Sequence, residues 1–318
     1  MVSTVNTHAD VKSDSGIDGP PYEHIVRDMT KLADENDHVE LIEYGFSSVR
    51  KNSPDQAMPL VGVLIKPFED SDNINRLTLI TGATHGNEYV HIVDRLPSRI
   101  VEETASNDIS TGMHQYLQSG GAFLIIPIVN PYGYSVKPKP QRRNADRLDL
   151  NRDFPTTKSK HKSLRSAEIS HLIKIVDDLL HRYDATLMLT VDYHCCYEGT
   201  NGRKRGALMY SPRMKKIMKN NNTLIAKAYA AIGQALMAQI PMARFDSWRD
   251  LVPSDPKGTS TDYWQRTHHS LSFTYEGEEY LDKGKRELRG EHRRFQSHYQ
   301  WLNDIMMNGA VNDYYNSM

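Results

Sequence analysis

Apolar and polar positions along the chain form two repeating patterns, and the first is a set of short apolar runs. Runs of strand length occur at residues 39–44, 60–65, 77–81, 122–129, 187–192, 207–210 and 271–275. The run at 122–129 is apolar almost throughout and lies between Gly121 and Asn130-Pro131. That pattern is typical of a strand buried on both faces.

The second pattern is helical periodicity between these runs. It is clearest over residues 166–183, where one stripe at three- and four-residue spacing contains Ile169, Leu172, Ile173, Val176, Leu179, Leu180 and Tyr183. Ser166 is a suitable N-cap for this helix. Further helices are predicted at residues 22–35, from about residue 88, at 214–239 with an interruption near 220–222, and at 283–307. Strands that alternate with helices predict an α/β sheet covered by helices on both faces.

The chain has one hydrophobic core by this pattern, without internal repeats or a second core beyond a linker. Residues 1–20 are polar and lead into Gly19-Pro20-Pro21, which indicates a flexible N-terminal tail. We therefore expect a single domain over residues 21–318. A chain of 318 residues is long enough to bury a sizeable core without disulfides.

Composition excludes two classes of function. The chain has 39 Lys and Arg against 40 Asp and Glu, so it lacks the basic excess of nucleic-acid-binding or anionic-membrane-binding proteins. Its longest apolar run is far shorter than the roughly 18 residues of a membrane span. We expect neither nucleic acid nor membrane as a partner.

The cysteines and the N-terminus favour a cytoplasmic protein. The two cysteines, Cys195 and Cys196, are adjacent and cannot form a disulfide framework. The N-terminal segment lacks the basic start and apolar stretch of a secretory signal. A secreted form with its signal removed would have the same sequence.

The main candidate site is Thr84-His85-Gly86-Asn87-Glu88, directly after the strand predicted at 77–81. Of the 14 histidines, His85 is the one with Glu three residues later. A glycine-containing turn at the end of a central strand directs both side chains into the crevice where α/β sheets bind ligands. Imidazole and carboxylate suit Zn²⁺, and a catalytic zinc needs three protein ligands with one open position.

His194 is the candidate for the third ligand, because it lies at the end of the buried strand predicted at 187–192. The alternative for each histidine is an exposed loop position. The joint pattern of His85, Glu88 and His194 favours one zinc ion per chain.

Two further segments carry candidate chemistry. Residues 142–155 are rich in arginine and asparagine, and most such segments are solvated loops. A guanidinium next to an amide nevertheless suits bidentate binding of a carboxylate, and a second arginine would stabilise an oxyanion. Glu276 lies at the end of the apolar strand predicted at 271–275, where it would suit a general base.

Taken in order, these motifs resemble the zinc metallocarboxypeptidase family. The ordered set is His-x-x-Glu, Arg-x-Asn followed by Asp-Leu-Asn-Arg-x-Phe-Pro, a strand-end His, Gly-x-Ser-x-Asp and Phe-Thr-x-Glu, from His85 to Glu276. The resemblance implies a single-domain, twisted mixed sheet of about eight strands flanked by helices on both faces. The spacing looks closest to bacterial members that cut murein-type peptides.

The resemblance also implies roles for individual residues. His85, Glu88 and His194 would hold Zn²⁺, and Asp149 would accept a hydrogen bond from His85 and fix its tautomer. Asn151 and Arg152 would clamp the terminal carboxylate of the substrate. Arg142 would polarise the scissile carbonyl, with Arg143 as the alternative, and Glu276 would be the general base that passes a proton to the leaving amine.

The sequence departs from the family pattern at the Gly-x-Ser-x-Asp segment, Gly258 to Asp262. The family's mobile tyrosine, a few residues earlier, is missing, and Trp248 and Arg249 are the nearest substitutes. Thr261 takes the position that often sets the side-chain preference of the pocket. Because it is small and neutral, it argues against a pocket for basic residues.

The resulting prediction is a zinc-dependent carboxypeptidase that hydrolyses the C-terminal amide bond of a peptide with a free carboxylate, with murein-type peptides as one candidate substrate. The first alternative is an N-acyl amino acid deacylase of the aspartoacylase or succinylglutamate desuccinylase type. Those relatives usually add a small β domain, whereas residues 283–307 here predict a helix. A non-catalytic peptide-binding module is the third interpretation, and Glu276 argues against it.

Overall fold

The computed structural model places most of the chain, with several gaps. It describes residues 19–50, 57–68, 73–105, 111–136, 138–156, 165–195, 207–211, 213–214, 217, 222–240, 244–247, 258–277, 281–282, 285–286 and 291–318. Trp248, Arg249, Cys196 and nearly all of the expected N-terminal tail lie outside these ranges.

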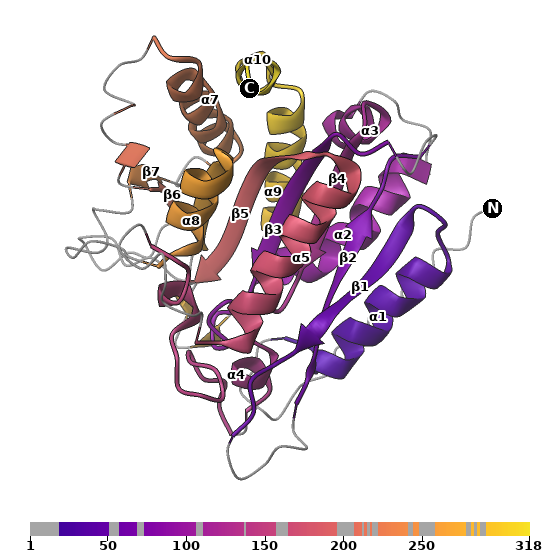
Figure 1. Cartoon of the computed structure of the whole chain (residues 1–318), viewed down its shortest axis with the longest axis vertical. Coiled ribbons are helices and arrows are strands. Elements are labelled where there is room, and N and C mark those ends of the chain that lie inside the picture. The colour runs from indigo at the N-terminus through magenta and orange to yellow at the C-terminus, as the bar shows by residue number, and fades with distance from the viewer. Residues whose placement is uncertain are drawn as a thin grey trace.

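An eight-stranded mixed sheet forms the centre of the molecule (Figure 1). In spatial order its strands are β1 (Val39–Phe46), β2 (Pro59–Ile65), β4 (Gly121–Ile126), β3 (Arg76–Gly82), β5 (Thr186–Cys195), β8 (Leu271–Gly277), β6 (Ala207–Tyr210) and β7 (Arg244–Ser247). The central strands β4, β3, β5 and β8 run parallel to one another. Strand β2 is antiparallel to both β1 and β4, and β6 is antiparallel to β8.

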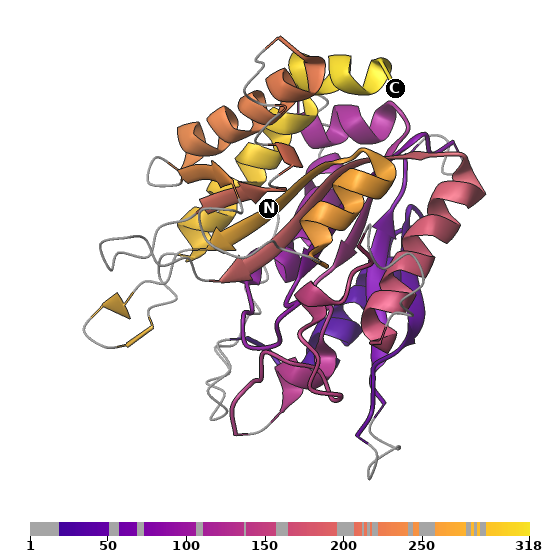
Figure 2. The same ribbon diagram turned by 60° about the vertical axis from the view of Figure 1, so that its left-hand side comes forward.

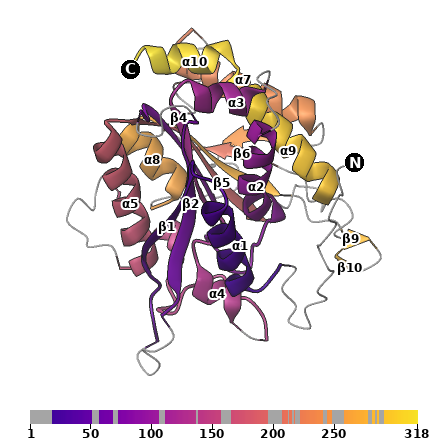
Figure 3. The same cartoon turned by 90° about the vertical axis from the view of Figure 1, so that its right-hand side faces the viewer.

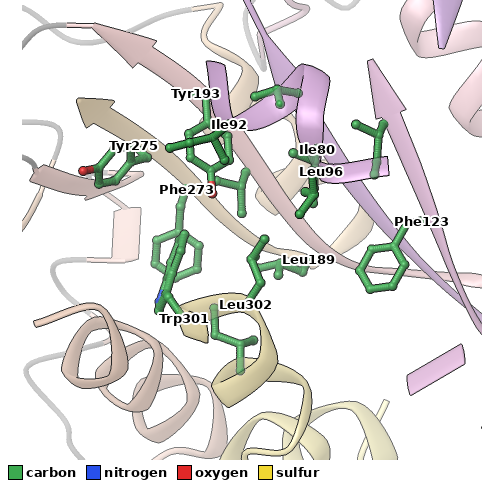
Figure 4. Close-up of a cluster of buried hydrophobic side chains, with 14 of the residues drawn as sticks. Ile80, Ile92, Leu96, Phe123, Leu189, Tyr193, Phe273, Tyr275, Trp301 and Leu302 are labelled. Atoms are coloured by element: carbon green, nitrogen blue, oxygen red, sulfur yellow. The ribbon is translucent and has the colours of Figure 1, made fainter. Parts of the chain in front are cut away.

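Helices cover both faces of this sheet (Figure 3). One face carries α1 (Tyr22–Asp34), α2 (His91–Ala105), α3 (Gly112–Gln118), α7 (Leu224–Gln239), α9 (Glu291–Met306) and α10 (Gly309–Asn316). Their apolar residues pack on the sheet in one cluster, in which Phe273 and Leu189 of the sheet lie near Trp301 and Leu302 of α9 (Figure 4). The predicted fold class, a single-domain mixed sheet between helices, is confirmed.

The other face is covered by α5 (Ala167–Tyr183) and α8 (Ser260–His268). The apolar stripe of α5 is buried against β1 to β5, as its periodicity predicts. Tyr263 and Trp264 of α8 join the same cluster. Two short helices, α4 (Pro131–Ser135) and the 3₁₀ helix Leu150–Arg152, follow β4 and precede α5.

The last helix differs from its prediction. A helix was expected from residue 283, but residues 285–286 form β10 (Lys285–Arg286), which pairs with β9 (Leu281–Asp282), and α9 begins only at Glu291. Lysine and arginine have good helix propensity, but tertiary pairing overrides so weak a preference. None of the described helices combines the length and the apolar character needed to cross a lipid bilayer.

Both β5 and β8 extend beyond their predicted ends, and this extension positions the candidate site. They include His194 and Glu276, which were expected to follow the strands, and the parallel register places these two residues opposite each other. The two strands end at the same edge of the sheet (Figure 2). The carboxyl ends of central parallel strands are the usual ligand-binding edge of an α/β sheet.

Candidate metal centre and active site

The turn after β3 places His85 and Glu88 at this edge. Ala83 has a positive φ of 46°, and the backbone N–H of Glu88 donates to the carbonyl of His85 at 2.9 Å. Gly86 packs directly on α4, where a Cβ atom would lie 2.2 Å from the carbonyl carbon of Gly133. Only glycine fits this contact, so the tight turn follows from close packing as well as from local sequence.

His85, Glu88 and His194 converge on one centre. Oε2 of Glu88 lies 2.9 Å from Nδ1 of His85 and 2.9 Å from Nδ1 of His194. The two Nδ1 atoms are 3.1 Å apart. Both histidines are almost completely buried, at 3% and 1% exposure, so water competes little for these atoms.

The other ring nitrogen of each histidine faces a carboxylate. Nε2 of His85 lies 3.0 Å from Oδ1 of Asp149, and Nε2 of His194 lies 2.9 Å from Oδ2 of Asp192. A carboxylate in this place holds the proton on Nε2 and leaves the lone pair of Nδ1 for a metal ion.

Asp192 was not among the residues that the sequence analysis assigned. It is buried, and its oxygens also accept hydrogen bonds from the hydroxyls of Thr81, Thr84 and Ser260 at 2.9, 2.8 and 2.7 Å. A sequence signal does exist, because Asp192 precedes His194 by two residues and therefore shares its face of the strand.

We expect Asp192→Asn to lower metal affinity about 10- to 100-fold. Asparagine can keep its oxygen toward His194 and Ser260 while its NH₂ group faces Thr81 and Thr84, so the change removes charge and leaves the shape. Chelator competition measures the affinity. The exposed Asp178, which pairs with Lys174, provides the control Asp178→Asn. Equal affinities in the two variants would contradict the role of Asp192.

The charges of the centre support one another. Burial raises the pKa of Glu88, but its close contacts with His194 and His85 outweigh it and hold that pKa well below its usual range. Burial lowers the pKa of His194, but Asp192 and Glu88 outweigh it and raise that pKa well above its usual range. The carboxylates of Glu88 and Asp192 therefore stabilise a positive charge, such as a bound cation, at this centre.

The donor set fits a zinc ion. One atom from each of His85, Glu88 and His194 lies within 4.8 Å of the others, and no second cluster of this kind occurs in the part of the chain that the structure describes. Two imidazole nitrogens and one carboxylate oxygen are usual zinc ligands. Two Nδ1 atoms 3.1 Å apart can share one cation.

The two adjacent arginines separate in the structure. Arg142 reaches the centre, where Nη1 donates to Oε1 of Glu88 at 2.9 Å and Nε donates to Oδ2 of Asp149 at 3.1 Å. Arg143 instead donates through Nη1 to the backbone carbonyl of Arg147 at 2.9 Å. Of the two alternatives for the carbonyl-polarising residue, Arg142 is the one beside the candidate metal ligands.

Asn151 and Arg152 border the same centre. Asn151 is fully buried; its Oδ1 accepts from the backbone N–H of Ser260 at 2.9 Å and its Nδ2 lies 3.4 Å from Nε2 of His194. Because Nε2 of His194 donates to Asp192, the NH₂ group of Asn151 keeps its donor capacity. Nη1 of Arg152 donates to the carbonyl of Asn151 at 2.7 Å.

Glu276 is on β8, the strand that pairs with β5 next to His194, and Thr261 is on the helix α8 that precedes β8. Glu276 is opposite His194 in the parallel register, and burial raises the pKa of its carboxyl group. Thr261, in the first turn of α8, is buried, and its hydroxyl lies 2.6 Å from that of Thr274, which pairs with Asp192. A carboxylate with a raised pKa next to a candidate metal centre suits proton transfer.

Comparison with known protein families identifies one that matches this chain. The model of the succinylglutamate desuccinylase/aspartoacylase catalytic domain matches residues 75–276, a segment that begins just before β3 and ends at Glu276. No curated protein sequence matches the chain.

Solved structures of three other proteins share the fold of this chain. A metallo-carboxypeptidase from Burkholderia cenocepacia matches with a TM-score of 0.66 and 17% identity, over 92% of this chain and 70% of the other. Bovine thrombin-activatable fibrinolysis inhibitor, solved with a tick carboxypeptidase inhibitor, matches with a TM-score of 0.63 and 15% identity, over 92% and 97%. The ectoine utilization protein EutE (DoeB) from Ruegeria pomeroyi matches with a TM-score of 0.50 and 18% identity, over 83% and 66%.

Proposed function

Since the chain belongs to the succinylglutamate desuccinylase/aspartoacylase catalytic-domain family and is a metallohydrolase with the carboxypeptidase fold, we propose that it is a zinc-dependent carboxypeptidase. It would hydrolyse the amide bond that precedes a C-terminal residue with a free carboxylate. Peptides of the murein type are included in the proposed substrate class.

One observation carries the proposal: a half-buried carboxylate, Glu276, lies opposite the candidate metal ligand His194 in the β5–β8 register. Ligand binding alone gains nothing from a carboxylate whose burial is unfavourable in its charged form. Hydrolysis needs a group at this position that accepts a proton and then releases it. The pairing therefore favours an enzyme over a peptide-binding module.

The proposed mechanism assigns one task to each side chain. When bound by His85, Glu88 and His194, zinc supplies Lewis-acid polarisation and lowers the pKa of water. Glu276 takes a proton from the attacking water and passes it to the leaving amine. Arg142 directs its guanidinium N–H groups at the negative charge that develops on the carbonyl oxygen.

The carboxylate of the substrate would bind at Asn151 and Arg152. Burial lowers the pKa of Arg152, while the nearby Asp149 opposes that shift, so the guanidinium stays positively charged at neutral pH. The small, paired hydroxyls of Thr261 and Thr274 would form the floor beneath the side chain of the released residue.

Arg152→Ala is expected to raise KM about 10- to 100-fold for substrates with a free carboxylate, because a charge-assisted bidentate contact is lost. Amidated versions of the same substrates should show little change. Arg152→Lys keeps the charge without the fork and should be intermediate. If amidated and free substrates are affected equally, the carboxylate contact is misassigned.

The family description specifically supports a second candidate, an N-acyl amino acid deacylase. Both reactions hydrolyse an amide whose amine side bears a carboxylate. A matched library of peptides, murein-type peptides and N-acetyl or N-succinyl amino acids, each with the same C-terminal residue, separates the two. Released amino acids are measured with and without a chelator. Turnover of the N-acyl amino acids alone would replace the peptidase proposal.

A further inference from the structure

Glu168 is a fully buried acidic residue that the proposed mechanism does not use. It is the second residue of α5. Its Oε1 accepts a hydrogen bond from the backbone N–H of Ser48 at 3.0 Å, and its Oε2 accepts from the hydroxyl of Ser48 at 2.9 Å and from Nδ2 of Asn144 at 3.0 Å. Burial of a carboxylate is unfavourable unless hydrogen bonds satisfy it. Here they do, and they join the start of α5 to the chain after β1 and to the segment that contains Asn144.

That segment, residues 142–149, is named the arginine loop, and its two ends meet beside the metal centre. Nε of Arg142, at one end, donates to Oδ2 of Asp149, at the other end, at 3.1 Å. Between the ends, the backbone N–H of Asn144 donates to the carbonyl of Leu148 at 3.1 Å, and Oδ1 of Asn144 accepts from the N–H of Leu148 at 2.9 Å. The side chain of Asn144 therefore closes the loop with its oxygen and attaches the loop to the buried carboxylate with its NH₂ group.

The contact between Glu168 and Asn144 has a fixed direction. Nδ2 of Asn144 must donate, because its Oδ1 already accepts from the loop backbone. A glutamine at position 168 would turn its NH₂ group either toward the NH₂ group of Asn144 or toward the backbone N–H of Ser48, and both arrangements oppose two donors. The backbone beside Ser48 is held, because the N–H of Ser47 donates to the carbonyl of Met58 at 2.8 Å. We therefore expect the contact with the arginine loop to be the one that is lost.

We propose that Glu168 is a positioning residue, which holds the arginine loop through Asn144 and so keeps the guanidinium of Arg142 beside the metal centre. The inference rests on the proposed function, in which this guanidinium stabilises the negative charge that develops on the carbonyl oxygen. Such a donor is effective only when it is directed before the reaction begins. Glu168 is not among the residues that converge on the metal centre, so its effect must pass through the loop.

The test reverses the direction of the contact between Glu168 and Asn144. Glu168→Gln opposes two donors, and Asn144→Asp opposes two carboxylates. The double variant Glu168→Gln/Asn144→Asp restores the hydrogen bond, because the new amide donates to the new carboxylate, whose other oxygen still accepts from Leu148. Its net charge equals that of wild type. The matched control is Glu23→Gln, because the exposed Glu23 is also the second residue of its helix, α1.

Two readouts separate positioning from folding. Hydrogen–deuterium exchange of the arginine loop requires no turnover, and it reports whether the loop is held, since the N–H groups of Asn144, Arg147 and Leu148 all donate within the loop. The values of kcat and KM, measured with Arg142 present and in an Arg142→Met background, report whether the effect reaches the guanidinium. Metal analysis of each preparation checks that the centre is intact.

In Glu168→Gln we expect the arginine loop to exchange about tenfold faster and kcat to fall about 10- to 100-fold. KM should stay within about threefold of wild type, because the lost interaction acts on the transition state. In the Arg142→Met background the same change should lower kcat less than about twofold, since the group that it positions is gone. The double variant should return exchange and kcat to within about threefold of wild type, and Glu23→Gln should match wild type.

Any of three results would overturn the proposal: wild-type loop exchange in Glu168→Gln, an equal loss of kcat with and without Arg142, or a double variant no better than its single changes. Where circular dichroism shows that Glu168→Gln does not fold, Asn144→Ala replaces it, because Glu168 then keeps both contacts with Ser48. A loss of kcat that requires Arg142 supports the proposal, and an equal loss in both backgrounds, or no loss, overturns it.

The proposed function can fail separately from this inference. If wild type hydrolyses neither peptides nor N-acyl amino acids, the proposed function is wrong, and loop exchange alone decides the role of Glu168. Faster exchange in Glu168→Gln that the double variant reverses would then support the hold on the arginine loop, and unchanged exchange would overturn it.

Discussion

Glu276→Gln is expected to lower kcat by roughly 10³ while the protein still binds zinc. Glutamine has nearly the same shape as glutamate but cannot accept the proton that the reaction removes from water. Because Glu276 is not among the residues that converge on the metal, zinc content should stay at one ion per chain. Hydrolysis assays and metal analysis of the same preparation measure both quantities.

The raised pKa of Glu276 adds a pH dependence to this prediction. Burial is the main cause, so the group is protonated at a higher pH than an ordinary glutamate. Because the base acts only when deprotonated, wild-type kcat should fall as pH decreases through this raised pKa. The residual activity of Glu276→Gln should lack that acid limb. Turnover equal to wild type would show that another group is the base.

A stability measurement serves as the control for this variant. A carboxyl group with a raised folded pKa favours the folded state in its protonated form, and this contribution is lost as pH rises through that pKa. Above that pKa the ionised Glu276 therefore lowers stability, and Glu276→Gln should unfold there at a temperature equal to or above that of wild type. A large decrease would mean that lost activity reflects misfolding.

Removal of the metal is expected to abolish hydrolysis and to lower the temperature of unfolding. A ligand at about 100 times its dissociation constant stabilises a protein by about 2.7 kcal/mol, which corresponds to roughly 5 °C for a chain of this size. Activity assays and thermal unfolding with and without a chelator measure the two effects. Added zinc should restore both.

His194→Ala and His181→Ala provide the matched pair for this prediction. His194 is buried in the metal centre, whereas His181 is exposed near the end of α5. His194→Ala should bind no zinc, show no hydrolysis and fail to respond to the chelator. His181→Ala should behave as wild type. Full activity of wild type in the presence of the chelator would contradict a metal-dependent mechanism.

The elements with strong local patterns were predictable from the sequence. The apolar stripe of α5 and the fully apolar run of β4 required no knowledge of their neighbours, because burial on one or both faces determines their periodicity. The helices α3, α8 and α10 were not predicted. Each is short, and α8 and α10 begin with caps at Thr259 and Asn308 whose patterns resemble ordinary turns.

The sequence by itself determined the fold class and the identity of the candidate residues, since periodicity and motif order are properties of neighbouring positions. Only the tertiary structure decided which atoms meet. The β5–β8 register places Glu276 opposite His194, and the extended β5 brings Asp192 to the same histidine. Of the two adjacent arginines, Arg142 contacts Glu88, whereas Arg143 contacts the backbone of Arg147. The two longest of these contacts, Glu276 with His194 and Arg142 with Glu88, join residues 82 and 54 positions apart. Their geometry depends on strand order and on hydrogen bonds that local sequence does not encode.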